Sequence, residues 1–207
     1  MQPAENLARA PGVQKVPTSK LHLFIKRRFL SPEECGRLIA LIDANRRPST
    51  IADDVGDPLF RTSETCDMDR NHPDVAALDA KIVELLGLDA AHGEPIQGQR
   101  YEVGQEFKAH TDYFEPGGPD YETHCSLTGQ RTWTAMIYLN EPVAGGATRF
   151  VKIDKMVQPE TGKLLTWNNQ TPEGQVNGNT LHHGMKVRAG TKYVVTKWFR
   201  ERPWTWA

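Results

Sequence analysis

Two side chains with different ligand chemistry, His110 and Asp112, are separated by one residue in a segment with strand-like composition. Because alternate residues of a β-strand project from the same face, an imidazole and a carboxylate at this spacing point at one position in space. Imidazole nitrogens and carboxylate oxygens both bind divalent first-row metals. A His-x-Asp pair also occurs by chance on protein surfaces, so a further ligand is needed to indicate a metal site.

A second imidazole far along the chain would complete a set of two His and one carboxylate on one face of the ion. Such a set leaves three coordination positions open for a cosubstrate and O2, which is the arrangement of non-haem Fe(II) oxygenases. The candidates are His182 and His183 in Thr180-Leu181-His182-His183-Gly184. Adjacent strand residues face opposite ways, so only one of the two can point into the site.

These ligands fall in a half of the chain where short strand-like runs alternate with turns. Breaks such as Glu115-Pro116-Gly117-Gly118-Pro119 and Gly145-Gly146 separate runs rich in β-branched and aromatic residues. The expected strands are Gln97–Val103, Phe107–Asp112, Thr132–Leu139, Thr148–Val151, Lys163–Trp167, Thr180–His183 and Lys192–Phe199. With helices upstream, this pattern predicts an α+β chain whose core is a β-sandwich or barrel.

Two helices are expected before the strands. Ser31-Pro32-Glu33-Glu34 has the pattern of a capping box with Pro at the first helical position, followed by an apolar stripe at helical spacing. A second helix should begin around Pro73 and end at Gly87, which suits a left-handed C-cap. Residues 48–72 are expected to form a long loop, and residues 1–20 a flexible N-terminal arm.

Three segments together resemble prolyl 4-hydroxylase-type Fe(II)/2-oxoglutarate-dependent dioxygenases. In that family's closing motif, a His is followed eight residues later by Gly and ten later by Lys, and counting back from Gly190 and Lys192 reaches His182. Residues 100–114, which contain the His-x-Asp pair, are similar to the family's first metal motif. Residues 138–150 are similar to its middle strand and Gly-Gly-x-Thr-x-Phe turn. The resemblance covers roughly residues 21–201.

The resemblance implies a ligand set, a fold and a reaction. His110, Asp112 and His182 would bind Fe(2+). The fold would be a double-stranded β-helix, or jelly roll, with N-terminal helices packed on one sheet. Residues 21–207 would form a single domain with its catalytic core at about 96–201. The reaction would couple hydroxylation of a substrate to oxidative decarboxylation of 2-oxoglutarate to succinate and CO2, with O2 as a cosubstrate and ascorbate as a reductant.

Lys192 is the candidate for binding the distal carboxylate of 2-oxoglutarate. A Lys ammonium is a compact point charge that can anchor one carboxylate, and Lys192 shares a strand face with the core-type residues Val194 and Trp198. By resemblance, Tyr101 would donate its phenol to the same carboxylate, while Thr148 and Trp198 would line the pocket. Ordinary packing is the alternative role for these three residues.

The substrate side of the site is where the chain departs from the family. His183 and Lys186 stand where the family usually has a small residue and a Pro. Arg61, in an Arg-Thr-Ser stretch similar to one near substrate in the family, and Tyr113 are the candidates for substrate contact. The loops 48–72 and 115–122 are candidate lids, with solvated surface loops as the alternative.

Composition bounds the partners of this chain. Lys and Arg total 25 against 26 Asp and Glu, which gives no net field to attract a polyanion. Because of this balance, nucleic acid is not an expected partner. No apolar segment is long enough to span a membrane, so a membrane is not an expected partner either. Three widely spaced Cys, and a first 20 residues without an apolar signal region, favour a reducing, cytoplasmic setting.

The leading hypothesis is hydroxylation of a prolyl residue in a peptide or protein. One alternative keeps the iron chemistry but has a free amino acid or small metabolite as substrate. An alternative from another class is a non-catalytic metal-binding β-sandwich, such as a sensor. The presence of all three candidate ligands together with Lys192 argues against the sensor.

Overall fold

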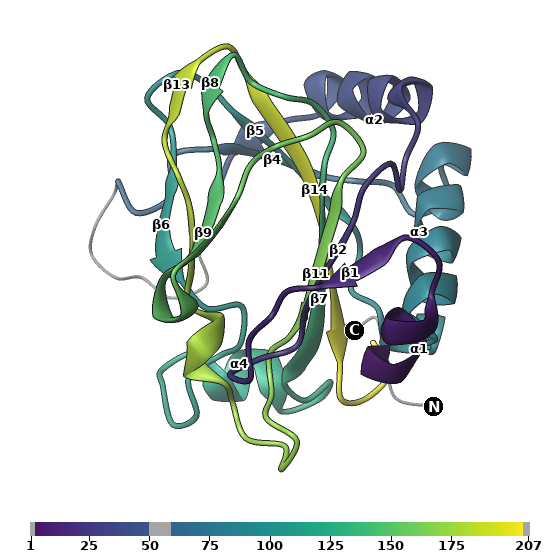
Figure 1. The fold of residues 1–207 in the computed structure, drawn as a ribbon, viewed down its shortest axis with the longest axis vertical. Coiled ribbons are helices and arrows are strands. Elements are labelled where there is room, and N and C mark those ends of the chain that lie inside the picture. The colour runs from purple at the N-terminus through teal and green to yellow at the C-terminus, as the bar shows by residue number, and fades with distance from the viewer. Residues whose placement is uncertain (1–2, 50–58, 205–207) are drawn as a thin grey trace.

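The computed structural model of the chain describes residues 3–49 and 59–204. Its described part is α+β, with two main antiparallel sheets that face each other and the N-terminal helices on the outside of the larger one (Figure 1). The helices are α1 (Pro3–Arg9), α2 (Pro32–Ala44), α3 (Pro73–Leu86) and α4 (Tyr121–Cys125), with 3-10 turns at Ala90–His92, Val151–Ile153 and Gly178–Thr180. The expected α+β class with N-terminal helices packed on one sheet is confirmed.

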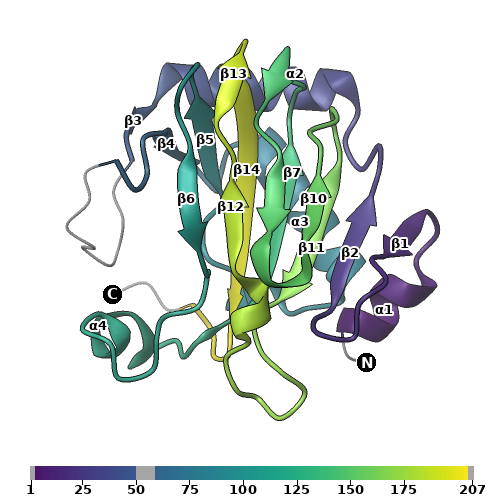
Figure 2. The same cartoon turned by 60° about the vertical axis from the view of Figure 1, so that its left-hand side comes forward.

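Among the described residues, the larger sheet has eight strands and the smaller one has four. In spatial order, the larger sheet consists of β1 (Val13–Lys15), β2 (Leu23–Lys26), β11 (Leu164–Asn168), β7 (Arg131–Tyr138), β14 (Lys192–Arg200), β5 (Gln97–Tyr101), β4 (Glu64–Asp67) and β3 (Arg47–Pro48). The smaller sheet, seen at the front of Figure 2, consists of β10 (Lys155–Val157), β9 (Thr148–Phe150), β12 (His182–Gly184) and β6 (Phe107–His110). A separate pair joins β8 (Ala144–Gly145) to β13 (Val187–Ala189).

Alternation of side chains along the central strands separates two cores. In β7, Ala135 and Ile137 belong to the cluster packed under the helices, whereas Met136 and Tyr138 belong to the cluster between the two sheets. This follows from the two-residue period of a strand that is covered on both faces. Strand β14 behaves in the same way: Val195 and Phe199 pack under the helices, whereas Val194 points into the space between the two sheets.

The two predicted helices are confirmed, and their ends follow from local chemistry. The backbone N–H of Glu34 donates to the Ser31 hydroxyl at 3.2 Å, and the backbone N–H of Ser31 donates to the Glu34 carboxylate at 2.8 Å, which completes the capping box of α2. His72 caps the start of α3 by accepting a hydrogen bond from the backbone N–H of Asp74. Gly87 ends that helix in the left-handed conformation at φ 66°.

The prediction of a flexible arm over residues 1–20 was wrong for the described part of that segment. Residues 3–9 form α1, and Leu7 is fully buried in the cluster under the helices. The side-chain amide of Asn6 donates to the Leu86 carbonyl at 3.1 Å, which ties α1 to the end of α3. One apolar residue in a polar segment leaves no periodic signal, yet here it anchors the segment.

The prediction that residues 48–72 form one long loop was also wrong in part. Within that range Glu64–Asp67 forms β4, which pairs with β5, while residues 50–58 lie outside the described residues. The loop expected over 115–122 ends where α4 begins at Tyr121. In the described part of the chain, no helix combines the length and apolar character that crossing a membrane requires.

Candidate metal and cosubstrate site

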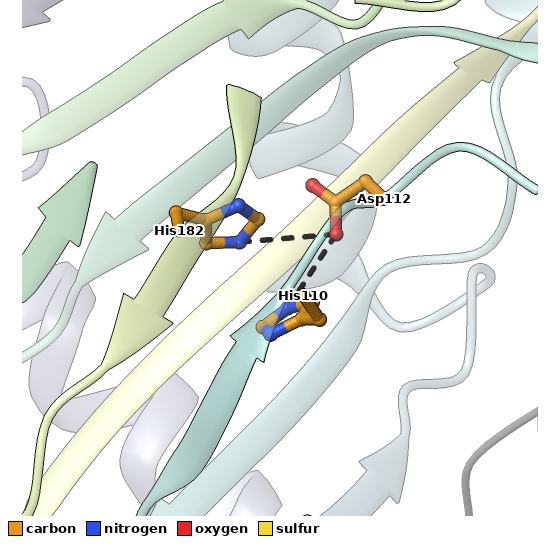
Figure 3. Close-up of side chains that lie close together, drawn as sticks. All are labelled: His110, Asp112 and His182. Atoms are coloured by element: carbon orange, nitrogen blue, oxygen red, sulfur yellow. Dashed lines mark ion pairs between the residues drawn. The ribbon is translucent and has the colours of Figure 1, made fainter. Parts of the chain in front are cut away.

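The structure brings His110, Asp112 and His182 together, with one ligand atom of each lying within 4.8 Å of the others. His110 ends β6, and it lies directly opposite His182, the first residue of β12. Asp112 lies beyond the end of β6, so the strand expected to reach residue 112 stops two residues early. Figure 3 shows the three side chains converging from β6, β12 and the segment that follows β6.

The distances between these side chains suit ligands of one ion. Nε2 of His110 and Nε2 of His182 each lie 3.9 Å from Oδ1 of Asp112. These separations are too long for hydrogen bonds. Two ligands that are each about 2.1 Å from a shared ion lie no more than about 4.2 Å apart. The arrangement is therefore one in which the Asp112 oxygen and each imidazole can share a metal.

Backbone carbonyls fix the orientation of both imidazoles. Nδ1 of His110 donates to the Lys108 carbonyl at 2.7 Å, and Nδ1 of His182 donates to the Thr180 carbonyl at 2.9 Å. Because a carbonyl only accepts hydrogen bonds, each Nδ1 carries a proton, which leaves Nε2 as the nitrogen of each ring that can bind a metal. Burial, reinforced by the neighbouring His182, lowers the pKa of His110 to about 3, which keeps that ring neutral.

Aromatic rings enclose the two imidazoles. The ring of Phe107 stacks on His110 with centroids 3.5 Å apart. Trp167 meets His182 edge-on at 4.9 Å, and Phe150 lies 5.7 Å from the same ring. This apolar wall limits the access of water and strengthens electrostatic interactions at the site.

His183 faces away from the metal position. Its Nε2 lies 2.9 Å from a carboxylate oxygen of Glu106, and Lys186 lies 3.4 Å from the other oxygen of the same carboxylate. His182 is buried, whereas His183 is only partly buried. Of the two adjacent imidazoles, only the first points at Asp112. The two residues that depart from the family pattern thus share one carboxylate outside the site.

Lys192 lies in the same pocket as the three candidate ligands. It is 2% exposed and stands directly opposite Tyr101 in the pairing of β14 with β5. Its ammonium lies 4.9 Å from the Tyr101 ring centroid and 5.5 Å from that of Tyr138. Within the described residues, no oxygen accepts a hydrogen bond from it and no carboxylate pairs with it. Burial lowers the pKa of Lys192 to about 7.

The other predicted cosubstrate residues also line this pocket, together with Arg61. Tyr101 is buried, which raises the pKa of its phenol. The hydroxyl of Thr148 accepts a hydrogen bond from the Tyr138 phenol at 2.6 Å. Trp198 is covered by the Arg131 guanidinium, 4.0 Å from its ring.

Tyr113, the other predicted substrate residue, is not among the residues that line the pocket. The sequence analysis missed several that do. Gln99 lies two residues before the predicted Tyr101 on β5, so the two-residue period could have found it, whereas Met136 has no predicted site residue at that spacing. Trp167 and Phe107 had no such signal. The residues that line the pocket are Arg61, Gln99, Tyr101, Phe107, His110, Asp112, Met136, Thr148, Trp167, His182, Gly184, Lys192, Val194, Thr196 and Trp198.

Comparison with known proteins identifies the family. Residues 96–200, about half of the chain, match the family model described as the 2OG-Fe(II) oxygenase superfamily. Prolyl 4-hydroxylase 1 of Arabidopsis thaliana is 31% identical over 200 residues, which cover 87% of this chain and 69% of that protein. This chain belongs to the 2OG-Fe(II) oxygenase superfamily.

Further similarities support the fold of this superfamily member. The crystal structure of a viral collagen prolyl hydroxylase from Paramecium Bursaria Chlorella virus-1, in complex with 2OG, has a TM-score of 0.68 and 28% identity, covering 86% of this chain and 94% of that one. The expected jelly-roll fold is thereby confirmed. Prolyl 4-hydroxylase subunit alpha-1 of Gallus gallus is 34% identical over 130 residues, 63% of this chain. The chain spans only 25% of that subunit and 37% of the matching subunit of Bos taurus.

Fe(II) and 2-oxoglutarate are the metal and cosubstrate of this superfamily, and the pocket fits both. The donor set, two imidazoles and one carboxylate, is the one that non-haem Fe(II) oxygenases use. Lys192 is buried in the same pocket with no carboxylate partner in the described part of the chain, and its ammonium suits the distal carboxylate of a dianionic keto acid.

Proposed function

We propose that this chain is an Fe(II)- and 2-oxoglutarate-dependent hydroxylase that acts on a prolyl residue in a peptide or protein. The observation that carries the proposal is that one pocket contains both the converging ligand set and Lys192, whose ammonium has no oxygen partner among the described residues. The names of the similar proteins, prolyl 4-hydroxylases and a collagen prolyl hydroxylase, supply the substrate class. A metal sensor would need the ligands but would have no use for a buried lysine ammonium beside them.

The residues of the pocket divide the work of such a reaction. His110, Asp112 and His182 would hold Fe(II), which when bound supplies the activation of O2. Lys192 would bind the distal carboxylate of 2-oxoglutarate from the opposite sheet, and the aromatic wall would exclude water. Arg61 would contact the substrate, because the bridge from its segment to Phe107 at the start of β6 places it in the lining of the same pocket.

Substrate oxidation and succinate release test the proposal together. The purified chain with Fe(II), 2-oxoglutarate and a proline-containing peptide should add one oxygen atom to the peptide, detected by mass spectrometry, and release an equal amount of succinate. The matched control is the same peptide with Ala in place of Pro, which should gain no oxygen. Oxidation of free proline without oxidation of the peptide would favour the small-molecule alternative and overturn the peptide substrate. Absence of succinate formation with both the peptide and free proline would overturn the proposal that the chain is a 2-oxoglutarate-dependent enzyme.

A further inference from the structure

We propose that Thr134 and Asn169 form a buried hydrogen-bond relay that holds the Asp112 carboxylate in a mode where one oxygen alone faces the metal. The inference rests on the proposed metal site and assigns two positioning residues to it. Neither residue lines the pocket, and neither belongs to the segments that resemble the family's metal motifs. Their role follows from where the two oxygens of Asp112 lie.

The two carboxylate oxygens of Asp112 have different surroundings. Oδ1 lies 3.9 Å from Nε2 of His110 and 3.9 Å from Nε2 of His182. Oδ2 accepts a hydrogen bond from the Thr134 hydroxyl at 2.7 Å. One oxygen is therefore available to the ion shared by the imidazoles, while the other is occupied by a protein donor.

Asn169 fixes the direction in which the Thr134 hydroxyl points. The side-chain amide of Asn169 donates to the Thr134 oxygen at 2.9 Å. A hydroxyl has a single hydrogen, and an amide N–H already occupies one of its lone pairs, so that hydrogen is directed to Asp112. Thr134 and Asn169 both have 0% exposure, so water does not compete for these bonds.

The relay is anchored in the larger sheet. Thr134 lies in the middle of β7, opposite Trp167 of β11 and Trp198 of β14. Asn169 follows β11, where its backbone N–H donates to the Thr132 carbonyl at 2.7 Å and its carbonyl accepts from Asn177 at 2.9 Å. Both members of the relay are thus held by the backbone of a central part of the sheet.

Asp112 needs such an anchor because it lies beyond the last residue of β6 and has no strand partner of its own. Arg131, in the same strand as Thr134, adds a contact of 3.3 Å to the Asp112 carbonyl. A carboxylate can bind a metal through one oxygen or two. Occupying Oδ2 with a hydroxyl keeps the second oxygen off the ion, which leaves the adjacent coordination position for cosubstrate or O2.

Metal affinity, measured without turnover, tests the relay. Mn(II) binding to the full chain is measured by isothermal titration calorimetry for wild type, Thr134→Val, Thr134→Ser and Asn169→Leu. Loss of an outer hydrogen-bond partner of a ligand typically lowers metal affinity about 10- to 100-fold, and this is the loss expected for Thr134→Val. Thr134→Ser, which keeps the hydroxyl, should bind close to wild type. Asn169→Leu should bind more weakly than wild type but better than Thr134→Val.

Thr166→Val is the matched control. Thr166 is another buried threonine of the same sheet, and its hydroxyl donates to the Thr134 carbonyl at 2.8 Å rather than to Asp112. Its loss should leave Mn(II) affinity unchanged. Thermal unfolding followed by circular dichroism identifies variants that do not fold, and if Thr134→Val is among them, the comparison of Asn169→Leu with Thr166→Val decides.

The same titrations separate failure of the relay from failure of the metal site. Wild-type affinity in both Thr134→Val and Asn169→Leu, with loss of binding in His182→Ala, would overturn the relay and leave the metal site in place. Wild-type affinity in His182→Ala as well would overturn the metal site, and with it the proposed function. An equal loss in Thr166→Val and Thr134→Val would also overturn the relay, because the effect would then be one of packing.

Discussion

At the metal end of the pocket, protein groups hold the side chains in place, whereas at the opposite end the ammonium of Lys192 has no oxygen partner among the described residues. Backbone carbonyls orient the two imidazoles, and a buried hydroxyl orients Asp112. Lys192 instead lies against two aromatic rings, with its pKa lowered by burial. The side chains at the metal end are therefore held in position without the metal ion, whereas the ammonium at the lysine end gains an oxygen partner only when 2-oxoglutarate binds.

The two ends also come from different parts of the fold. The candidate metal ligands lie on the smaller sheet or just beyond it, and Lys192 lies on the larger sheet. A cosubstrate that touches both the ion and Lys192 would bridge the two sheets. Changes at the metal end should therefore remove binding of both metal and cosubstrate, whereas changes at the lysine end should affect cosubstrate alone.

The largest effect is expected from His182→Ala. Loss of an outer partner of a ligand already costs about 10- to 100-fold in metal affinity, so loss of a direct ligand should cost at least about 100-fold. The measurement is Mn(II) or anaerobic Fe(II) titration. His183→Ala is the neighbouring control, because its imidazole pairs with Glu106 outside the site, and it should bind metal close to wild type. The reverse result would mean that the ligand is residue 183.

Lys192→Ala should separate the two ends. Truncating one partner of a buried charge pair costs about 2–5 kcal/mol, and about 1.4 kcal/mol corresponds to a tenfold change, so the affinity for 2-oxoglutarate should fall by about 30-fold or more. Metal affinity should stay close to wild type. Lys163→Met is the control, since Lys163 is also buried but is bonded to the Gln158 carbonyl and Glu160. A parallel loss of metal affinity in Lys192→Ala would contradict the independence of the two ends.

Strand periodicity explains how much of this site the sequence could predict. Lys192, Val194, Thr196 and Trp198 line one pocket because alternate residues of a strand share a face, which is a local rule. The choice of His182 over His183 needed the family motif. Strand periodicity shows that the two adjacent side chains face opposite ways, but it does not show which of them faces the metal. Asp112 was expected to lie on the strand, and it converges on the histidines from beyond the strand end.

Pairing between distant segments explains what the sequence could not predict. Thr134 and Asn169 meet because β7 pairs with β11, and Arg61 reaches the pocket because its segment bridges to Phe107. Strand β4 was mistaken for loop because it is only four residues long and owes its place to β5. Which strands pair with each other depends on segments far along the chain, and no local sequence pattern predicts that pairing.

The affinity for 2-oxoglutarate should depend on pH through Lys192. With a pKa of about 7 in the free protein, Lys192 is protonated below pH 7 and loses its charge above it. The distal carboxylate needs the charged form, so affinity should be level below pH 7 and fall by up to about tenfold per pH unit above it. Calorimetry in buffers of different ionisation enthalpy should detect proton uptake on binding at pH 8. Lys192→Ala should show neither the slope nor the uptake, and an unchanged slope in that variant would assign the titration to another group.

The smallest effect concerns the stability of the protein without ligands. It tests whether the buried ammonium of Lys192 lowers the free energy of unfolding when no cosubstrate is bound. Because the pKa of Lys192 is about 7 in the folded protein, below its ordinary 10.5, the unfolded chain holds that proton more tightly. The resulting penalty is full below pH 7 and fades as pH rises from 7 to 10.5. Lys192→Met, which keeps an apolar chain of similar length, should therefore raise the thermal midpoint at pH 6, by about 2–4 °C per kcal/mol gained, and raise it less at pH 9. The measurement is thermal unfolding of metal-free wild type and variant at both pH values.

Saturating metal and 2-oxoglutarate should reverse the order of the two thermal midpoints, since only wild type then gains a partner for the cation. A variant less stable than wild type without ligands at pH 6 would show that the aromatic rings already compensate the buried charge, and the contrast between the two ends would not hold.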